Sequence, residues 1–204
     1  LPKIDVAIVG EPTMMQLAIA EKGLVVFDGK VGGTASHAAH PNNDNPISKL
    51  PNIIKWLENF SFEKVSNTLG PVKLTVTQIK AGNQHNVVPA CVDLVVDVRV
   101  NDCYSNKEIV AILQKDPPLT LTPRSLNLNS SSISIDHPLV KAGIELGRST
   151  YGSPTLSDQA KLSCPSLKLG PGDSTRSHTA NEFIFIKEID EAITLYINLL
   201  KKIL

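Results

Sequence analysis

The sequence predicts an α/β protein in which a small α+β domain is inserted into a larger sheet domain. Residues 4–9 form a short apolar, β-branched run that Gly10 and Pro12 close, which is typical of a strand buried on both faces of a parallel sheet. Residues 23–128 then follow the order β-α-β-β-α-β, the ferredoxin-like arrangement. We therefore expect a first segment of the sheet domain at 1–22, an inserted domain at 23–128, and a return to the sheet domain at 129–204.

Periodicity defines each element of the inserted domain. Apolar residues recur at helical spacing over 46–60, with Pro46 in the first turn. Ser105 and Glu108 fit a capping box that begins a second helix over 105–114. The strands are expected where apolar and polar residues alternate between turn residues, namely over 24–31, 72–79, 92–100 and 119–128.

The returning segment begins with the polar run 129–132, whose composition favours a flexible hinge. A helix over 138–150, a strand over 166–169 and a helix over 187–203 are expected to rejoin the strand at 4–9. The last helix carries an apolar face formed by Ile189, Ile193, Tyr196, Ile197 and Leu200.

Composition excludes several classes of function. The chain has 204 residues, 42% of them hydrophobic, which is enough for a sizeable core. Its 20 basic and 20 acidic residues balance, so we expect neither a nucleic-acid partner nor attraction to an anionic membrane. The three cysteines are odd in number and lack C-x-x-C spacing, which favours a reducing, cytoplasmic setting. No apolar run approaches the roughly 18 residues of a membrane span.

Glu11 and His178 are the candidate metal ligands. Both lie in loops bounded by Gly or Pro beside predicted strands, where sites are commonly built. Carboxylate oxygen and neutral imidazole nitrogen are good ligands for zinc. The alternative is that Glu11 caps a turn and that His178 is a surface histidine.

His37 could act as a general acid or as a donor to an oxyanion, because imidazole titrates near neutral pH. A structural role is the alternative, since it lies among small residues. His40, His85 and His137 occupy turn-like contexts and are assigned structural roles.

Arg99 ends a predicted strand, and its guanidinium suits a substrate carboxylate. The alternative is a salt bridge with Asp102 or Asp97; Asp97 is the less favoured partner, being expected to face the opposite side of the strand. The turn from Gly170 to Gly172 could bring backbone N–H groups close to a ligand, although turn geometry explains it equally well. It lacks the Lys and Ser/Thr of a phosphate loop.

Together these segments resemble the di-zinc deacylase and aminopeptidase family, which includes acetylornithine deacetylase, succinyl-diaminopimelate desuccinylase and carboxypeptidase G-type enzymes. The likeness covers the whole chain, and five short motifs occur in the family's order. They are Val-Gly-Glu-Pro-Thr at 9–13, Ala-Ser-His-Ala at 35–38 with Asp-Asn-Pro at 44–46, Asn-Val-Val-Pro at 86–89, Asp-Val-Arg at 97–99, and Gly-Pro-Gly at 170–172 before Ser-His-Thr-Ala-Asn-Glu at 177–182.

The resemblance implies a zinc-peptidase catalytic domain of the phosphorylase/hydrolase-like type with the inserted domain as its lid and dimerisation surface. It implies that Glu11 and His178 are ligands of a two-zinc site, in which cobalt can substitute. His37 would reach into the partner subunit of a homodimer and stabilise the oxyanion there. Asn86, Arg99 and Gly172 would hold the substrate, a small N-acyl amino acid.

One departure from the family is large. The His-x-Asp ligand pair, the bridging Asp and the Glu-Glu that supplies the general base do not occur in these residues. We therefore expect this chain to correspond to the C-terminal portion of a larger enzyme, and to be inactive and poor in metal by itself. The expected activity of the complete protein is amide hydrolysis that removes an acyl group from an amino acid. A di- or tripeptidase is the alternative within the family, and a non-catalytic dimerising or binding module is the alternative outside it.

Overall fold

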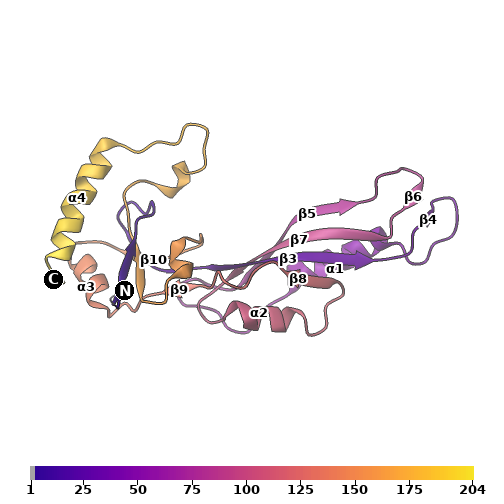
Figure 1. The fold of residues 1–204 in the computed structure, drawn as a ribbon, viewed down its shortest axis with the longest axis horizontal. Coiled ribbons are helices and arrows are strands. Elements are labelled where there is room, and N and C mark those ends of the chain that lie inside the picture. The colour runs from indigo at the N-terminus through magenta and orange to yellow at the C-terminus, as the bar shows by residue number, and fades with distance from the viewer. Residues whose placement is uncertain (1–2) are drawn as a thin grey trace.

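The computed structural model describes residues 3–204 and shows an elongated molecule with two lobes (Figure 1). One lobe contains α3, α4 and the sheet that includes β1, β10 and β11. The other lobe contains α1, α2 and a four-stranded sheet, and a small ribbon formed by β4 and β6 lies at its far end. Each lobe has its own hydrophobic core.

The second lobe has the ferredoxin-like order predicted from periodicity. Its sheet runs β5-β7-β3-β8, and every neighbouring pair is antiparallel. The α/β class and the inserted ferredoxin-like domain are therefore confirmed, while the division at residues 22/23 and 128/129 stays a prediction. The elements are β3 (Gly23–Gly32), α1 (Pro46–Asn59), β5 (Lys73–Ala81), β7 (Cys91–Val100), α2 (Asn106–Leu113) and β8 (Thr120–Pro123).

Alternation along the two central strands separates the core of this lobe from its open face. Val25 and Phe27 of β3 are fully buried, and so are Val96 and Val98 of β7 apart from at most 1% of their surface. The helices cover this side; the predicted capping box of α2 forms, because Ser105 and Glu108 bond each other's backbone N–H groups.

The sheet of the first lobe is mixed, whereas the sequence pattern predicts a parallel one. β1 (Ala7–Val9) is parallel to β11 (Ser166–Lys168), which is antiparallel to β2 (Leu17–Glu21). β10 (Thr150–Ser153) lies parallel to β2 on the other side. Because β1 is the outer strand of this described sheet, it is half-buried instead of buried on both faces.

The two helices of this lobe are α3 (Pro138–Glu145) and α4 (Ile186–Leu200). α4 packs through Ala192, Leu195 and Leu199, which are at most 8% exposed. Most of the apolar face predicted for this helix is exposed instead. Its exposed residues are Ile189, Ile193, Ile197 and Leu200, at 39–53%.

The polar run at 129–132 is not a free hinge. Ser131–Ser132 forms β9, which pairs with Ala20 and Glu21 of β2. The Ser130 hydroxyl donates to the Glu21 carbonyl oxygen at 2.6 Å, and Asn129 accepts from the Asn106 backbone N–H at 2.9 Å. Hydrogen bonding therefore pins a segment whose composition alone favours flexibility.

Two other expectations need correction. The strand expected over 119–128 is only β8, and the helix expected over 138–150 ends at Glu145, before the unpredicted strand β10. The unpredicted short elements are β4 (Ser36–His37), β6 (Val87–Val88), η1 (Asp158–Lys161) and η2 (Ser174–Arg176). Their short length leaves no periodic signal.

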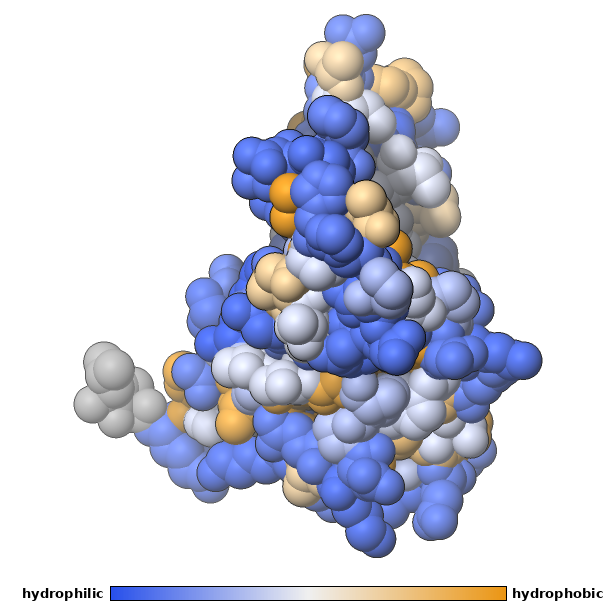
Figure 2. Space-filling model, turned by 90° about the vertical axis from the view of Figure 1, so that its right-hand side faces the viewer, coloured by the Kyte–Doolittle hydropathy of each residue, from blue (hydrophilic) through white to orange (hydrophobic). Residues whose placement is uncertain are grey.

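Figure 2 views the molecule from the end that carries β4 and β6; this side is mainly hydrophilic, with apolar residues in small groups. Within residues 3–204, none of the helices combines the length and the apolar character needed to cross a membrane.

Candidate functional site

Two of the predicted loops lie side by side because the strands before them are parallel neighbours. β1 leads into the loop that contains Glu11, and β11 leads into the turn from Gly170 to Gly172. Backbone N–H groups of Thr13 and Met15 donate to the Gly170 carbonyl oxygen, at 3.1 and 3.0 Å. The Met14 N–H donates to the Gly172 carbonyl oxygen at 2.8 Å.

Thr13 locks the two loops together from inside. Its side chain is buried, and its hydroxyl donates to the Gly170 carbonyl at 3.2 Å and accepts from the Gly170 N–H at 3.1 Å. Gly170 in turn lies directly against the backbone of half-buried Glu11. The Gly-Pro-Gly turn therefore supports the segment that presents Glu11.

Backbone strain gathers in these loops. Met14, Met15 and His178 have φ angles of 52°, 56° and 60°, and among residues 3–204 they are the non-glycine residues with positive φ. Such conformations cost on the order of 1–3 kcal/mol each and are concentrated at functional sites. Strain at Met14 and Met15 follows from bonding both N–H groups to the neighbouring turn.

His178 lies on the loop that projects from the lobe before α4 (Figure 1). The two ends of that loop meet beside the Glu11 segment: a Cβ at Gly172 would lie 3.4 Å from Ile184 and 3.8 Å from Pro12. The His178 side chain is exposed, and the backbone N–H of His178 donates to the Glu182 carboxylate at 3.0 Å. The fold thus brings the root of the His178 loop to the Glu11 segment.

An ion pair between Arg176 and Glu188 fastens the same loop to α4. The two guanidinium nitrogens lie 3.0 and 2.5 Å from the Glu188 oxygens. The guanidinium also lies over the rings of Phe183 and Phe185, at 5.0 and 5.2 Å from their centroids. Hydrogen bonding by Arg176, and then by the Phe185 N–H, lowers the pKa of Glu188. Thr179 bonds the Arg176 carbonyl, which links the pair to the residue after His178.

These residues do not complete a metal site. Within the described part of the chain, no group of three or more His, Cys, Asp or Glu side chains could hold a metal ion. Zinc sites need three or four protein ligands. Glu11 and His178 are suitable donors, but further donors would be required.

His37 and Asn86 lie together at the far end of the second lobe. β4 and β6 pair there, with His37 opposite Val87, and the Ala38 N–H donates to the Asn86 carbonyl oxygen at 2.9 Å. Both side chains are exposed. The His37 Nδ1 accepts from the Ala39 N–H at 3.1 Å, which leaves Nε2 available as a donor when it carries the proton.

Arg99 forms a two-point ion pair with Asp97, the partner that we considered less favoured. Nε and a terminal nitrogen of Arg99 lie 2.8 and 3.0 Å from the two Asp97 oxygens. The expectation that Asp97 faces away was wrong, because residues two apart on a strand share a face.

Arg99 is far from the other predicted substrate residue, Asn86. Arg99 pairs with Leu24 at the start of β3, whereas the opposite end of β7 begins at Cys91, beside Gly32. Eight residues of antiparallel strand span about 27 Å. Within one chain, Asn86 and Arg99 therefore lie at opposite ends of the sheet.

Sequence reasoning missed Thr13, the strained methionines, the Arg176–Glu188 pair and a buried pair formed by Glu21 and Lys168. The last pair could have been suspected from the sequence, because Glu21 and Lys168 are charged residues at the ends of apolar strands. The others depend on which loops meet in space.

The ferredoxin-like lobe and the loop geometry define the class to which this chain is similar. Residues 19–117 match the peptidase dimerisation domain of the M20 family. Aminopeptidase PepT from Bacillus cereus superposes with a TM-score of 0.75 at 15% identity, over 97% of this chain and 56% of that one. A dinuclear metal-binding M20 peptidase from Bacillus subtilis gives a TM-score of 0.59 at 13% identity, over 95% and 55% of the two chains.

Sequence similarity points to a narrower group. Succinyl-diaminopimelate desuccinylase of Rickettsia akari is 28% identical over 225 residues, which cover 99% of this chain and 59% of that protein. Residues 19–117 therefore belong to a peptidase dimerisation domain of the M20 type, and the chain as a whole is similar to M20 peptidases, as the motifs predicted. These curated relatives match nearly all of this chain, but the chain spans little more than half of their length.

Proposed function

We propose that this chain is part of a metal-dependent amide hydrolase that removes the acyl group from an N-acyl amino acid. The observation that carries the proposal is the meeting of the Glu11 segment, the Gly-Pro-Gly turn and the root of the His178 loop, with positive φ angles in the Glu11 segment and at His178. Similarity to succinyl-diaminopimelate desuccinylases supports a deacylase of that type, with acetylornithine deacetylase chemistry as a close variant.

In this proposal Glu11 and His178 are two ligands of a dinuclear zinc site, in which cobalt can substitute. The remaining ligands and the general base would come from residues that the 204-residue chain does not contain. The metal, when bound, would activate water for attack on the amide carbonyl. The 204-residue chain by itself is therefore expected to be inactive. Gly172 would border the bound substrate, because it lies between Pro12 and the base of the His178 loop.

The separation of Arg99 from Asn86 supports a division of the proposed substrate-binding roles between two subunits. We infer that the second lobe is the lid, and that the enzyme is a homodimer formed through it. His37 and Asn86, at the far end of the lid, would act in the partner's site. Arg99 would serve the site of its own chain, where Asp97 holds its guanidinium ready. The match to a dimerisation domain supports this arrangement.

The incomplete ligand set favours one alternative of another class, a non-catalytic dimerising module. Within the family, a di- or tripeptidase remains the alternative, because none of the proposed substrate residues of the lid is assigned to recognise the acyl group. We further propose a cytoplasmic protein without a nucleic-acid or membrane partner. The balanced charge and the three free cysteines support this setting.

Zinc content and amide hydrolysis of the full-length protein test the proposal. Glu11→Ala should lose metal and activity, whereas His37→Ala should keep metal and lose turnover. His85→Ala is the matched control, since His85 is an exposed histidine in the same end of the lid with an expected structural role. Equal metal and equal activity in Glu11→Ala and wild type would reject the site.

Subunit mixing tests the role of His37 across the dimer. A heterodimer of Glu11→Ala with His37→Ala contains one site in which both residues are intact. Random pairing of the two inactive variants should therefore restore about a quarter of wild-type activity. No recovery in verified heterodimers would place His37 in its own chain's site.

A further inference from the structure

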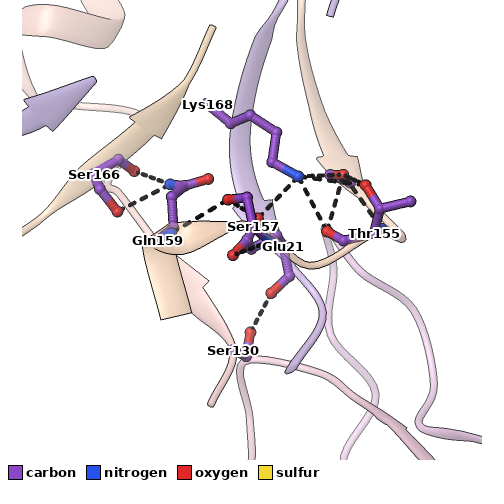
Figure 3. A network of polar contacts seen from close by, with 8 residues as sticks. Glu21, Ser130, Thr155, Ser157, Gln159, Ser166 and Lys168 are labelled. Atoms are coloured by element: carbon purple, nitrogen blue, oxygen red, sulfur yellow. Dashed lines mark hydrogen bonds and ion pairs between the residues drawn. The ribbon is translucent and has the colours of Figure 1, made fainter. Parts of the chain in front are cut away.

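Glu21 and Lys168 form an ion pair inside the first lobe, where charges are costly. The Lys168 ammonium lies 2.9 Å from Glu21 Oε2, and the two side chains are 3% and 0% exposed. Figure 3 shows the pair at the centre of a polar network in which Glu21 and Lys168 point toward each other. A buried pair of this kind contributes little net stability, since desolvation offsets the attraction between the charges. Its presence therefore calls for another role.

The hydrogen bonds around the pair fix its geometry. Lys168 also donates to Ser153 Oγ at 3.1 Å and to the Thr155 carbonyl at 3.1 Å. The Glu21 carboxylate accepts from the Ser157 N–H at 3.2 Å and from the Ser157 hydroxyl at 2.7 Å. Gln159 extends the network to Ser166 of β11. One segment, residues 153–159, therefore supplies hydrogen-bond partners to both charges.

The pair joins the root of the lid to the strand that supports the site. Glu21 ends β2 immediately before the lid begins, and the returning chain bonds Glu21 through Ser130 and β9. Lys168 ends β11, two residues before Gly170, which lies against Glu11. A displacement of either charge would be transmitted both to the lid and to the Glu11 segment.

Other contacts at this junction also leave little freedom. A Cβ at Gly23 would lie 2.4 Å from the Ser130 nitrogen, so the outgoing and returning segments touch. A Cβ at Gly152 would lie 2.3 Å from the Thr68 carbonyl oxygen, which shows that a lid loop packs on β10. Lys22 reaches the Pro71 carbonyl at 2.8 Å.

We propose that Glu21 and Lys168 are positioning residues that fix the orientation of the lid relative to the lobe that carries Glu11. The directional hydrogen bonds of the buried pair select one angle at the junction. Apolar side chains in place of the pair would allow several angles between the two lobes. This inference concerns the geometry of the chain itself and does not depend on metal or substrate.

The test measures stability and lid orientation separately in the full chain. Spin labels at Lys55→Cys in α1 and Asn198→Cys in α4, both exposed sites, report the distance between the lobes. The three native cysteines are replaced by serine, and labelled chain is diluted into unlabelled chain so that distances within one subunit dominate. Urea unfolding of the same samples reports stability.

Single substitutions Glu21→Gln and Lys168→Met should lower stability and broaden the distance distribution roughly twofold, because each leaves the other charge unpaired. The double variant should recover most of the lost stability while its distance distribution stays broad. Recovery of stability without recovery of a narrow distance distribution distinguishes a positioning role from a merely structural one. It also protects the test if a single variant fails to fold.

Matched controls come from Glu145 and Lys202, an exposed pair in the same lobe with a separation of 2.7 Å. Glu145→Gln and Lys202→Met should leave both measurements unchanged. A double variant of Glu21 and Lys168 with the wild-type distance distribution would overturn the proposal. Metal content and activity play no part in this result, so the proposed enzyme function can fail without affecting it.

Discussion

Gly170 touches the backbone of Glu11 so closely that a Cβ on Gly170 would lie 2.5 Å from the Glu11 carbonyl oxygen. The obstacle is main chain, which cannot rotate away as a flexible side chain could. Glycine is therefore required at this position for steric reasons, and the Glu11 segment depends on it.

Gly170→Ala should destabilise the chain by about 1–3 kcal/mol, the usual cost of forcing extra volume into a packed region. In the full-length protein it should also reduce metal content, because the Glu11 segment must move. Urea unfolding and metal analysis measure the two effects. Gly10→Ala is the control, since a Cβ there meets nothing within 4 Å. A Gly170→Ala variant as stable as Gly10→Ala would contradict the contact.

Thr13→Val should cost about 1–3 kcal/mol, because it leaves the Gly170 N–H without its acceptor, whereas the Gly170 carbonyl oxygen keeps its two backbone donors. The side chain is only 4% exposed, so water cannot replace the lost bonds. Thr13→Ser keeps the hydroxyl and should retain most of the stability. Chemical denaturation of both variants decides the point, and a loss of stability confined to Thr13→Ser would assign the role of Thr13 to its methyl group.

Glu188→Gln should alter the response of stability to acid. The pKa of Glu188 in the folded chain is lowered from its ordinary value of 4.5, chiefly by Arg176. A carboxylate with a lowered pKa stabilises the fold above that ordinary value, and this contribution disappears as the pH falls through the folded-state pKa.

The difference in Tm between wild type and Glu188→Gln should therefore be largest above about pH 5 and should shrink as the pH falls below 4.5. Thermal unfolding from pH 3 to 7 measures it. Glu191→Gln is a suitable control, since its pair with Lys187 is exposed on the same helix. A difference that stays constant with pH would remove Glu188 from the acid response.

Gly152→Ala should shift the lid, because its Cβ would meet the Thr68 carbonyl oxygen at 2.3 Å. We expect a changed mean distance between labels in the two lobes and a loss of stability of about 1–3 kcal/mol. Gly32→Ala, where nothing lies within 4 Å, is the control. An unchanged distance would show that the loop containing Thr68 yields without moving the lid.

Much of the lid was predictable from local pattern. The alternation along β3 and β7 and the Ser105–Glu108 capping box are short-range signals that tertiary packing did not overrule. The exposed face of α4 shows the limit. Periodicity identified the helix, but only packing decided that Ala192, Leu195 and Leu199, in place of Ile193 and Ile197, face the core.

The sequence by itself determined the order of the main elements in the ferredoxin-like lobe, the family resemblance and the identity of the residues suited to chemistry, because these depend on local pattern and motif. Only the tertiary structure decided which of them meet. It joined Glu11 to Gly170 through parallel strands, separated Asn86 from Arg99 along one sheet, and paired Arg99 with Asp97. It also buried Glu21 against Lys168, 147 residues apart, a relation set by strand topology that local periodicity does not encode.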